Sequence, residues 1–195
     1  FQSQAIMETF PAGGPVRTKI VGRLTPERER QAQRVKEDLN YMLTEKMSDY
    51  RSEHERMLFA LPLAGAAFKK VYWDPTLGRP SSLYVPAEDF VAPYGATDLP
   101  TATRYTHIMR KHPNEIRKLQ VIGFYRDIDL STPVPDRNEI QRIKDKLAGE
   151  ELTDQDDRHI LLEMHVDLDL PGYEDVGDDG EPTGVALPYV VTVEK

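Results

Sequence analysis

The sequence predicts an α+β fold in which N-terminal amphipathic helices pack on a mostly antiparallel sheet, with short helices inserted between strands. Apolar residues recur with helical spacing between residues 25 and 61, whereas later runs are β-branched, aromatic or alternating and are separated by turn residues. With 195 residues, 39% of them hydrophobic, the chain can bury a core. We therefore expect residues 1–66 to be mainly helical and residues 67–195 to mix strands with short helices.

The first 22 residues are rich in proline and glycine and include the run TKIV at residues 18–21. They predict an irregular entry followed by a short strand. Gly13 and Gly14 match no phosphate-binding glycine motif, so we interpret them as turn residues.

A helix is predicted to begin after Thr25, a favourable N-cap, with proline at the first helical position. Its apolar residues recur three to five positions apart and form one stripe: Ala32, Val35, Leu39, Met42 and Met47. We expect this stripe to pack within its own domain, because the repeat is too short for a stable coiled coil. An aspartate at Val35 or Leu39 should then unfold the chain.

A second helix is predicted from Ser48 or Asp49 towards Leu61. Pro62 lacks an amide hydrogen and should end or kink this helix. The small residues at 64–67 indicate that another backbone approaches closely.

The rest of the chain alternates between strand and helix patterns. We expect a hairpin of residues 68–74 and 82–85, then an extended segment at 86–105 and a strand at 105–109. A short helix at 114–120 that ends at Gly123, a second helix at 137–147 and a charged linker at 150–158 should follow. The last two strands are predicted at 159–170 and 186–193, joined by an acidic, glycine-rich loop.

Composition excludes several classes of site. The formal net charge of −8 argues against tight wrapping of nucleic acid, although DNA could slide past an acidic surface. The absence of cysteine removes disulfides, thiolate nucleophiles and cysteine zinc sites. No apolar run is long enough for a membrane span, and no signal-peptide pattern is present, so we expect a soluble protein made inside the cell.

The strand beginning at residue 159 carries candidate metal ligands. Period-two alternation places His159, Glu163, His165 and Asp167 on one face, and imidazole and carboxylate are suitable ligands. The opposite face is uniformly apolar, so an amphipathic strand with a wet outer face explains the same pattern. We favour the amphipathic strand and predict no metal there.

The following loop partly matches a calcium-binding loop through these residues: Asp167, Asp169, Gly172, Asp175 and Asp178. Pro171 occupies a ligand position and the flanking elements are strands. A solvated hairpin loop is the better interpretation.

Seven basic residues could contact phosphate or an acidic neighbour: Lys69, Lys70, Arg104, Arg110, Lys111, Arg117 and Lys118. With Tyr72, Trp73 and Tyr105 they imitate a platform for single-stranded nucleic acid, but a solvated strand edge and helix face explain them better. No nucleophile elbow or acid–base pair is present. The sequence therefore predicts no catalytic residue, no cofactor and no enzyme.

Two stretches carry a family resemblance: residues 61–99, LPLAGAAFKKVYWDPTLGRPSSLYVPAEDFVAPYGATDL, and residues 104–127, RYTHIMRKHPNEIRKLQVIGFYRD. A helix ends in a small-residue entry to a strand, and a crossing segment and a second strand then lead to a short helix. This pattern resembles the portal proteins of tailed bacteriophages, particularly short-tailed ones. The opening FPAGGPVRTKIVG and residues 159–195 fit the same family, so the resemblance covers nearly the whole chain without one diagnostic motif.

The resemblance implies that residues 1–195 are a fragment of the portal's wing domain, without its stem, clip, channel loop and crown. Portal proteins are non-enzymatic structural proteins that form homo-oligomeric rings, usually dodecamers, at one capsid vertex of the virion. They serve DNA packaging and DNA ejection, with capsid, scaffolding, terminase and tail adaptor proteins as partners and double-stranded DNA passing through the channel. The protein would be made in the cytoplasm of the bacterial host, with no membrane partner.

Two other functions stay open. One is a metal-dependent phage or host enzyme that uses the His159, Glu163, His165 and Asp167 face. The other is an adaptor module that binds a partner strand along an uncovered edge at residues 187–193.

Overall fold

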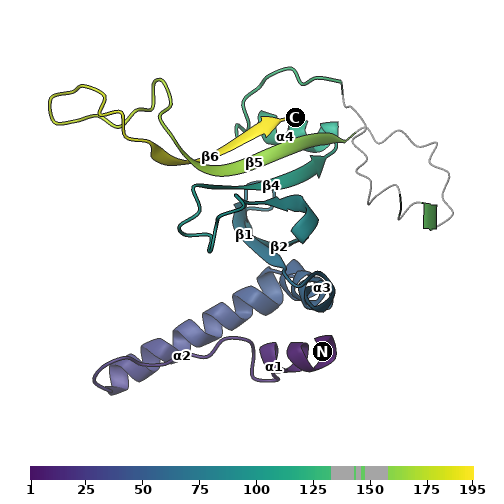
Figure 1. Ribbon diagram of the computed structural model, residues 1–195. Coiled ribbons are helices and arrows are strands. Elements are labelled where there is room, and N and C mark those ends of the chain that lie inside the picture. The colour runs from purple at the N-terminus through teal and green to yellow at the C-terminus, as the bar shows by residue number, and fades with distance from the viewer. Residues whose placement is uncertain (133–142, 144–145, 148–157) are drawn as a thin grey trace. The chain divides into compact units, whose positions relative to one another are not determined.

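The computed structural model describes residues 1–132, 143, 146–147 and 158–195. It confirms the α+β class, with helices and two antiparallel sheets (Figure 1). The chain divides into two compact units, Phe1–Ala87 and Glu88–Lys195. The predicted helix at 137–147 and linker at 150–158 fall almost entirely outside the described residues.

The first unit begins with a helix, α1 (Gln2–Thr9), where we predicted an irregular entry. Its sequence has no strong apolar period, so contacts with α3 (Asp49–Ala64) stabilise it. The Gln2 side chain donates to the carbonyl of Glu55 at 3.1 Å, and the ring of Phe10, just after α1, lies 5.8 Å from that of Tyr50. The predicted strand at residues 18–21 is wrong, because this segment pairs with no described strand.

The rings of Tyr50 and His54 and the ammonium group of Lys69 form a cluster, which we call the ring cluster, at the end of α1. The His54 ring stacks parallel to Tyr50, and the Lys69 Nζ lies 3.6 Å from the centre of the Tyr50 ring. Burial lowers the pKa of His54, and the neighbouring charge of Lys69 lowers it further. Burial also lowers the pKa of Lys69. The cluster therefore favours an uncharged imidazole between α1, α3 and the first strand.

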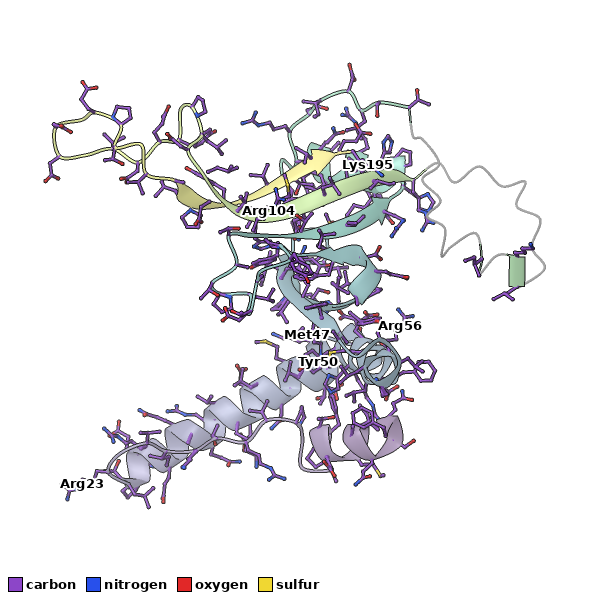
Figure 2. All side chains as sticks on the ribbon, viewed as in Figure 1. Arg23, Met47, Tyr50, Arg56, Arg104 and Lys195 are labelled. Atoms are coloured by element: carbon purple, nitrogen blue, oxygen red, sulfur yellow. The ribbon has the colours of Figure 1, made fainter. Side chains whose placement is uncertain are left out.

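The second helix, α2 (Pro26–Tyr41), begins where predicted. Thr25 accepts a hydrogen bond from the Arg28 amide at 3.3 Å, and a π-helical turn, η1 (Met42–Lys46), continues the helix. The predicted packing of its stripe is wrong. Val35 is 50% exposed and Leu39 is 37% exposed, because no described element covers them. Among the stripe residues only Met47, at the junction with α3, is buried (Figure 2).

Helix α3 extends past Pro62 to Ala64, so the proline lies inside its last turn rather than ending it. Gly65 ends the helix with a positive φ of 75°, a conformation that glycine adopts at little cost. The chain then enters the predicted hairpin of β1 (Phe68–Asp74) and β2 (Arg79–Val85).

Two acidic side chains of α3, a half-buried aspartate and a buried glutamate, attach it to this hairpin. Asp49 Oδ1 accepts from Arg79 Nη1 at 2.6 Å, while Oδ2 accepts from the Ser81 hydroxyl at 2.8 Å and the Ser82 amide at 3.2 Å. Burial alone would raise the Asp49 pKa, but these three donors lower it from 3.8 to about 2. One turn later, Glu53 is only 9% exposed and accepts from the Tyr84 amide at 2.8 Å. The hairpin is therefore held by charge-assisted bonds as well as by apolar contacts.

The second unit contains a four-stranded sheet in the order β3-β4-β5-β6, antiparallel throughout. A 3₁₀ turn, η2 (Ala87–Asp89), precedes it. Its elements are β3 (Phe90–Val91), β4 (Arg104–Lys111), α4 (Pro113–Val121), β5 (His159–Leu168) and β6 (Leu187–Glu194). Ile116 and Leu119 of α4 are buried, and the chain turns at Gly123 as predicted. None of the described helices has the length and apolar character needed to cross a bilayer.

Candidate functional site

The four-stranded sheet has two unlike faces, set by the register of its strands. His107, His159, Glu163, His165 and Glu194 lie on one face, which we call the histidine face. The sequence predicted that this face of β5 is wet. That prediction is wrong for His159, which is 5% exposed, and for Glu163, which is 9% exposed, whereas Asp167 is exposed.

Glu194 organises one end of the histidine face. Its Oε1 lies 2.6 Å from His159 Nδ1 and accepts from the Ser131 hydroxyl at 2.9 Å, while Oε2 accepts from the Ser131 amide at 3.2 Å. Burial would raise the Glu194 pKa, but the hydrogen bonds from His159 and Ser131 lower it below the ordinary value. The carboxylate therefore joins β5, β6 and the segment that follows α4.

The other end of this face is built from rings. His165 stacks on Tyr105 with ring centres 4.6 Å apart and planes 14° from parallel, and Tyr105 contacts Phe90. The His165 Nε2 lies 3.6 Å from Glu163 Oε1. Stacking and the nearby carboxylate fix this imidazole in place.

The four residues of the proposed metal face are not gathered around one point. Glu163 and His165 approach each other, but His159 is paired with Glu194, and Asp167 is exposed. Within the described ranges, no group of three or more His, Asp or Glu side chains could hold a metal ion. The arrangement contains one hydrogen-bonded pair, His159 with Glu194, and one looser contact between Glu163 and His165.

In the loop after β5, carboxylates bind groups of the loop itself. Asp175 Oδ2 accepts from the Thr183 hydroxyl at 2.7 Å, and the Asp175 carbonyl accepts from the Thr183 amide. Glu174 accepts from the Gly172 amide at 2.8 Å. These bonds belong to a closed hairpin loop with an isolated bridge between Val176 and Pro182.

The predicted basic residues are divided between the two units, and two of them pair with carboxylates. Arg110 pairs with Asp89 at 2.7 Å, and Arg117 pairs with Asp127. Lys69 lies in the ring cluster of the first unit, and the Lys70 Nζ lies 4.9 Å from the centre of the Tyr72 ring. Trp73 is 61% exposed on β1.

The opposite face of the four-stranded sheet is apolar and partly open. Ile108, Leu162, Met164 and Arg104 are among the residues that line a hollow of about 240 Å³ beside β3. The sequence predicted this apolar face and indicated that it packs in the protein interior. The described residues leave it half-buried.

Strand β6 forms one edge of this sheet, as the adaptor hypothesis expected of residues 187–193. The Lys195 amide donates to the Ile160 carbonyl, so Val193, Val191 and every second residue before them direct their backbone groups to β5. The backbone groups of Pro188, Val190, Thr192 and Glu194 therefore point away from the sheet. Pro188 has no amide hydrogen, which suits an edge position.

Sequence reasoning did not find Glu194, Ser131 or Tyr105 as partners of the histidines. Their neighbours across the sheet depend on register, which alternation within one strand does not give. No protein-family model matches the chain, and no curated protein matches it.

Proposed function

We propose that this chain is the wing part of a bacteriophage portal protein, a structural subunit of the ring through which DNA enters and leaves the capsid. The observation that carries the proposal is the order of elements across residues 61–127. Helix α3 ends at Gly65 and leads into β1, a crossing segment follows β2, and β4 leads directly into α4. This order supports the portal pattern quoted from the sequence.

Surfaces without a partner in the described structure also support a ring subunit. The stripe of α2 is exposed at Val35 and Leu39, and β6 presents a free edge. Large exposed apolar residues and open strand edges favour association with other chains. Subunits that meet head to tail close into rings when the rotation permits it.

The net charge of −8 suits a passage rather than a DNA-binding surface. A subunit with many unpaired cations would bind phosphates and hold the strand. In the described chain, several arginines already pair with carboxylates, including Arg79, Arg110 and Arg117.

The test is the mass of the complete portal protein that the proposal implies, measured by light scattering and by negative-stain imaging. We expect a ring of about a dozen subunits. A monomer would refute the proposal, and a monomer that binds a divalent cation would favour the metal-dependent enzyme.

The adaptor module is the second candidate, and the free edge of β6 favours it. An adaptor would bind a strand from another protein and would not assemble with copies of itself. A monomer that captures a heterologous strand along β6, shown by protection of the Val190 amide from exchange, would support it.

A further inference from the structure

The edge of β6 that pairs with no described strand belongs to an acidic stretch of the chain. From residue 159 to residue 194 the sequence contains nine Asp and Glu residues and no Lys or Arg: Glu163, Asp167, Asp169, Glu174, Asp175, Asp178, Asp179, Glu181 and Glu194. A strand that adds to this edge would enter a negative field, so a basic segment suits it.

The same chain contains a basic segment with the composition and length of a strand. Residues 17–21, RTKIV, which we call the basic arm, lie between Val16 and the start of α2. Between Glu8 and Glu27 the charged residues are Arg17, Lys19 and Arg23, all positive. The arm is strand-like in composition, yet no described strand pairs with it.

The arm is held at both ends and open between them. Val16 donates to Asn40 Oδ1 at 2.9 Å and accepts from Asn40 Nδ2 at 3.3 Å, which fixes the start of the arm against α2. Arg28 donates to the Arg23 carbonyl at 3.1 Å beyond its end. Figure 2 shows Arg23 at the end of α2 remote from Met47, so the arm runs along the helix. Val21 is 86% exposed.

We propose that the basic arm of one copy adds to the β6 edge of a second copy as a fifth strand. Residues 188–192 of β6 are available for this, because Ser131 already binds the side chain of Glu194 at the end of the strand. Val190 and Thr192 offer both an outward amide and an outward carbonyl, and Pro188 offers a carbonyl. Five residues of the arm match five residues of the edge in length.

The contact is heterologous, because arm and edge are different surfaces of the same chain. Each copy can therefore give its arm to one neighbour and receive an arm from the other, which is the connectivity of a ring. The inference thus deepens the proposed function and rests on it for the identity of the partner.

Cysteine pairing tests the contact, because the natural sequence has no cysteine. Copies carrying Val190→Cys are mixed with copies carrying Thr18→Cys or Lys19→Cys, which covers both side-chain parities of the arm. Paired strands bring Cα atoms within disulfide range. We expect the yield of mixed disulfide dimer to be at least about tenfold higher than when the Val190→Cys copies are mixed with copies carrying Ser3→Cys, an exposed position in α1 that serves as the control.

Two results would overturn the inference. One is a yield equal to that of the Ser3→Cys control. The other comes from a chain that carries both Lys19→Cys and Val190→Cys: a disulfide that forms only within single chains would place the arm on its own β6.

Proline substitutions supply a second test that separates the edge from the fold. The Thr192 amide points outward, so Thr192→Pro in the Val190→Cys chain should leave the circular dichroism intact and lower the mixed disulfide by roughly two- to tenfold. Val191→Pro is the matched control, since its amide points to β5 and its loss should disrupt the sheet. An unchanged disulfide yield with Thr192→Pro contradicts the added strand.

The disulfide and the ring mass answer separate questions. A ring of the complete protein without the mixed disulfide refutes the arm contact and leaves the portal function standing. A mixed disulfide with no ring supports the arm contact and removes the portal function.

Discussion

Replacing Asp49 by asparagine tests how the first unit is held together. The substitution keeps the size of the side chain but removes the charge that accepts from Arg79, Ser81 and Ser82. All three donors lie on the hairpin strand β2, so the loss should loosen the attachment of the hairpin to α3.

The pKa of Asp49 sets an upper limit on the effect. A fall from 3.8 to about 2 corresponds to roughly 2.4 kcal/mol at about 1.36 kcal/mol per unit. The side chain is 28% exposed, so solvent screening reduces this figure, and we expect a loss of about 1–2 kcal/mol at pH 7. The folded-state pKa is depressed, so the contribution is fully present above pH 3.8 and is lost as the pH falls towards about 2.

Trp73 is the sole tryptophan and lies on β1, so its fluorescence reports the unfolding of this unit. We expect Asp49→Asn to lower the urea midpoint by about 0.5–1 M at pH 7, and the difference from the natural chain to shrink between pH 4 and pH 2.5. Asp38→Asn, at an exposed position of α2, is the control and should leave the midpoint unchanged. An equal midpoint for Asp49→Asn and Asp38→Asn, or a difference independent of pH, would refute this reasoning.

Three further predictions concern other parts of the fold. Val35→Asp should change the free energy of unfolding of the 195-residue chain by no more than about 0.5 kcal/mol in thermal unfolding, whereas Ile116→Asp should unfold the second unit. Equal loss of stability in the two variants would contradict the exposure of the α2 stripe. Gly65→Ala should cost about 1 kcal/mol in chemical unfolding because of the positive φ, while Gly95→Ala, which has open space and no positive φ, should be neutral. Glu194→Gln should speed hydrogen exchange at the Ser131 amide at pH 7. In the natural chain, protection of this amide should fall as acid protonates Glu194, whose pKa is depressed. Exchange that neither the substitution nor acid changes would contradict the bond between Glu194 and Ser131.

Local signals predicted most elements, because caps and turns depend on neighbouring residues. Thr25 and Pro26 marked the start of α2, and Gly123 marked the turn after α4. Helix α1 was missed because contacts with α3, rather than its own apolar pattern, stabilise it. Pro62 did not end α3, which continues to Ala64 although proline has no amide hydrogen to donate to the carbonyl four residues earlier.

Which face of an element is buried was harder to predict. Alternation correctly separated the two faces of β5, but apolar character pointed to the wrong one as the interior. His159 can be buried because Glu194 on the neighbouring strand compensates the cost of burying it, and that partner depends on strand register. The stripe of α2 shows the converse, since an apolar pattern does not reveal whether its partner is within the same unit.

The mass of the complete protein in solution tests the central claim most directly. The portal proposal predicts a closed ring of about a dozen subunits, seen by negative-stain imaging and matched by light scattering. A complete protein that stays monomeric at concentrations up to about 100 μM would contradict it, because portal function depends on the ring.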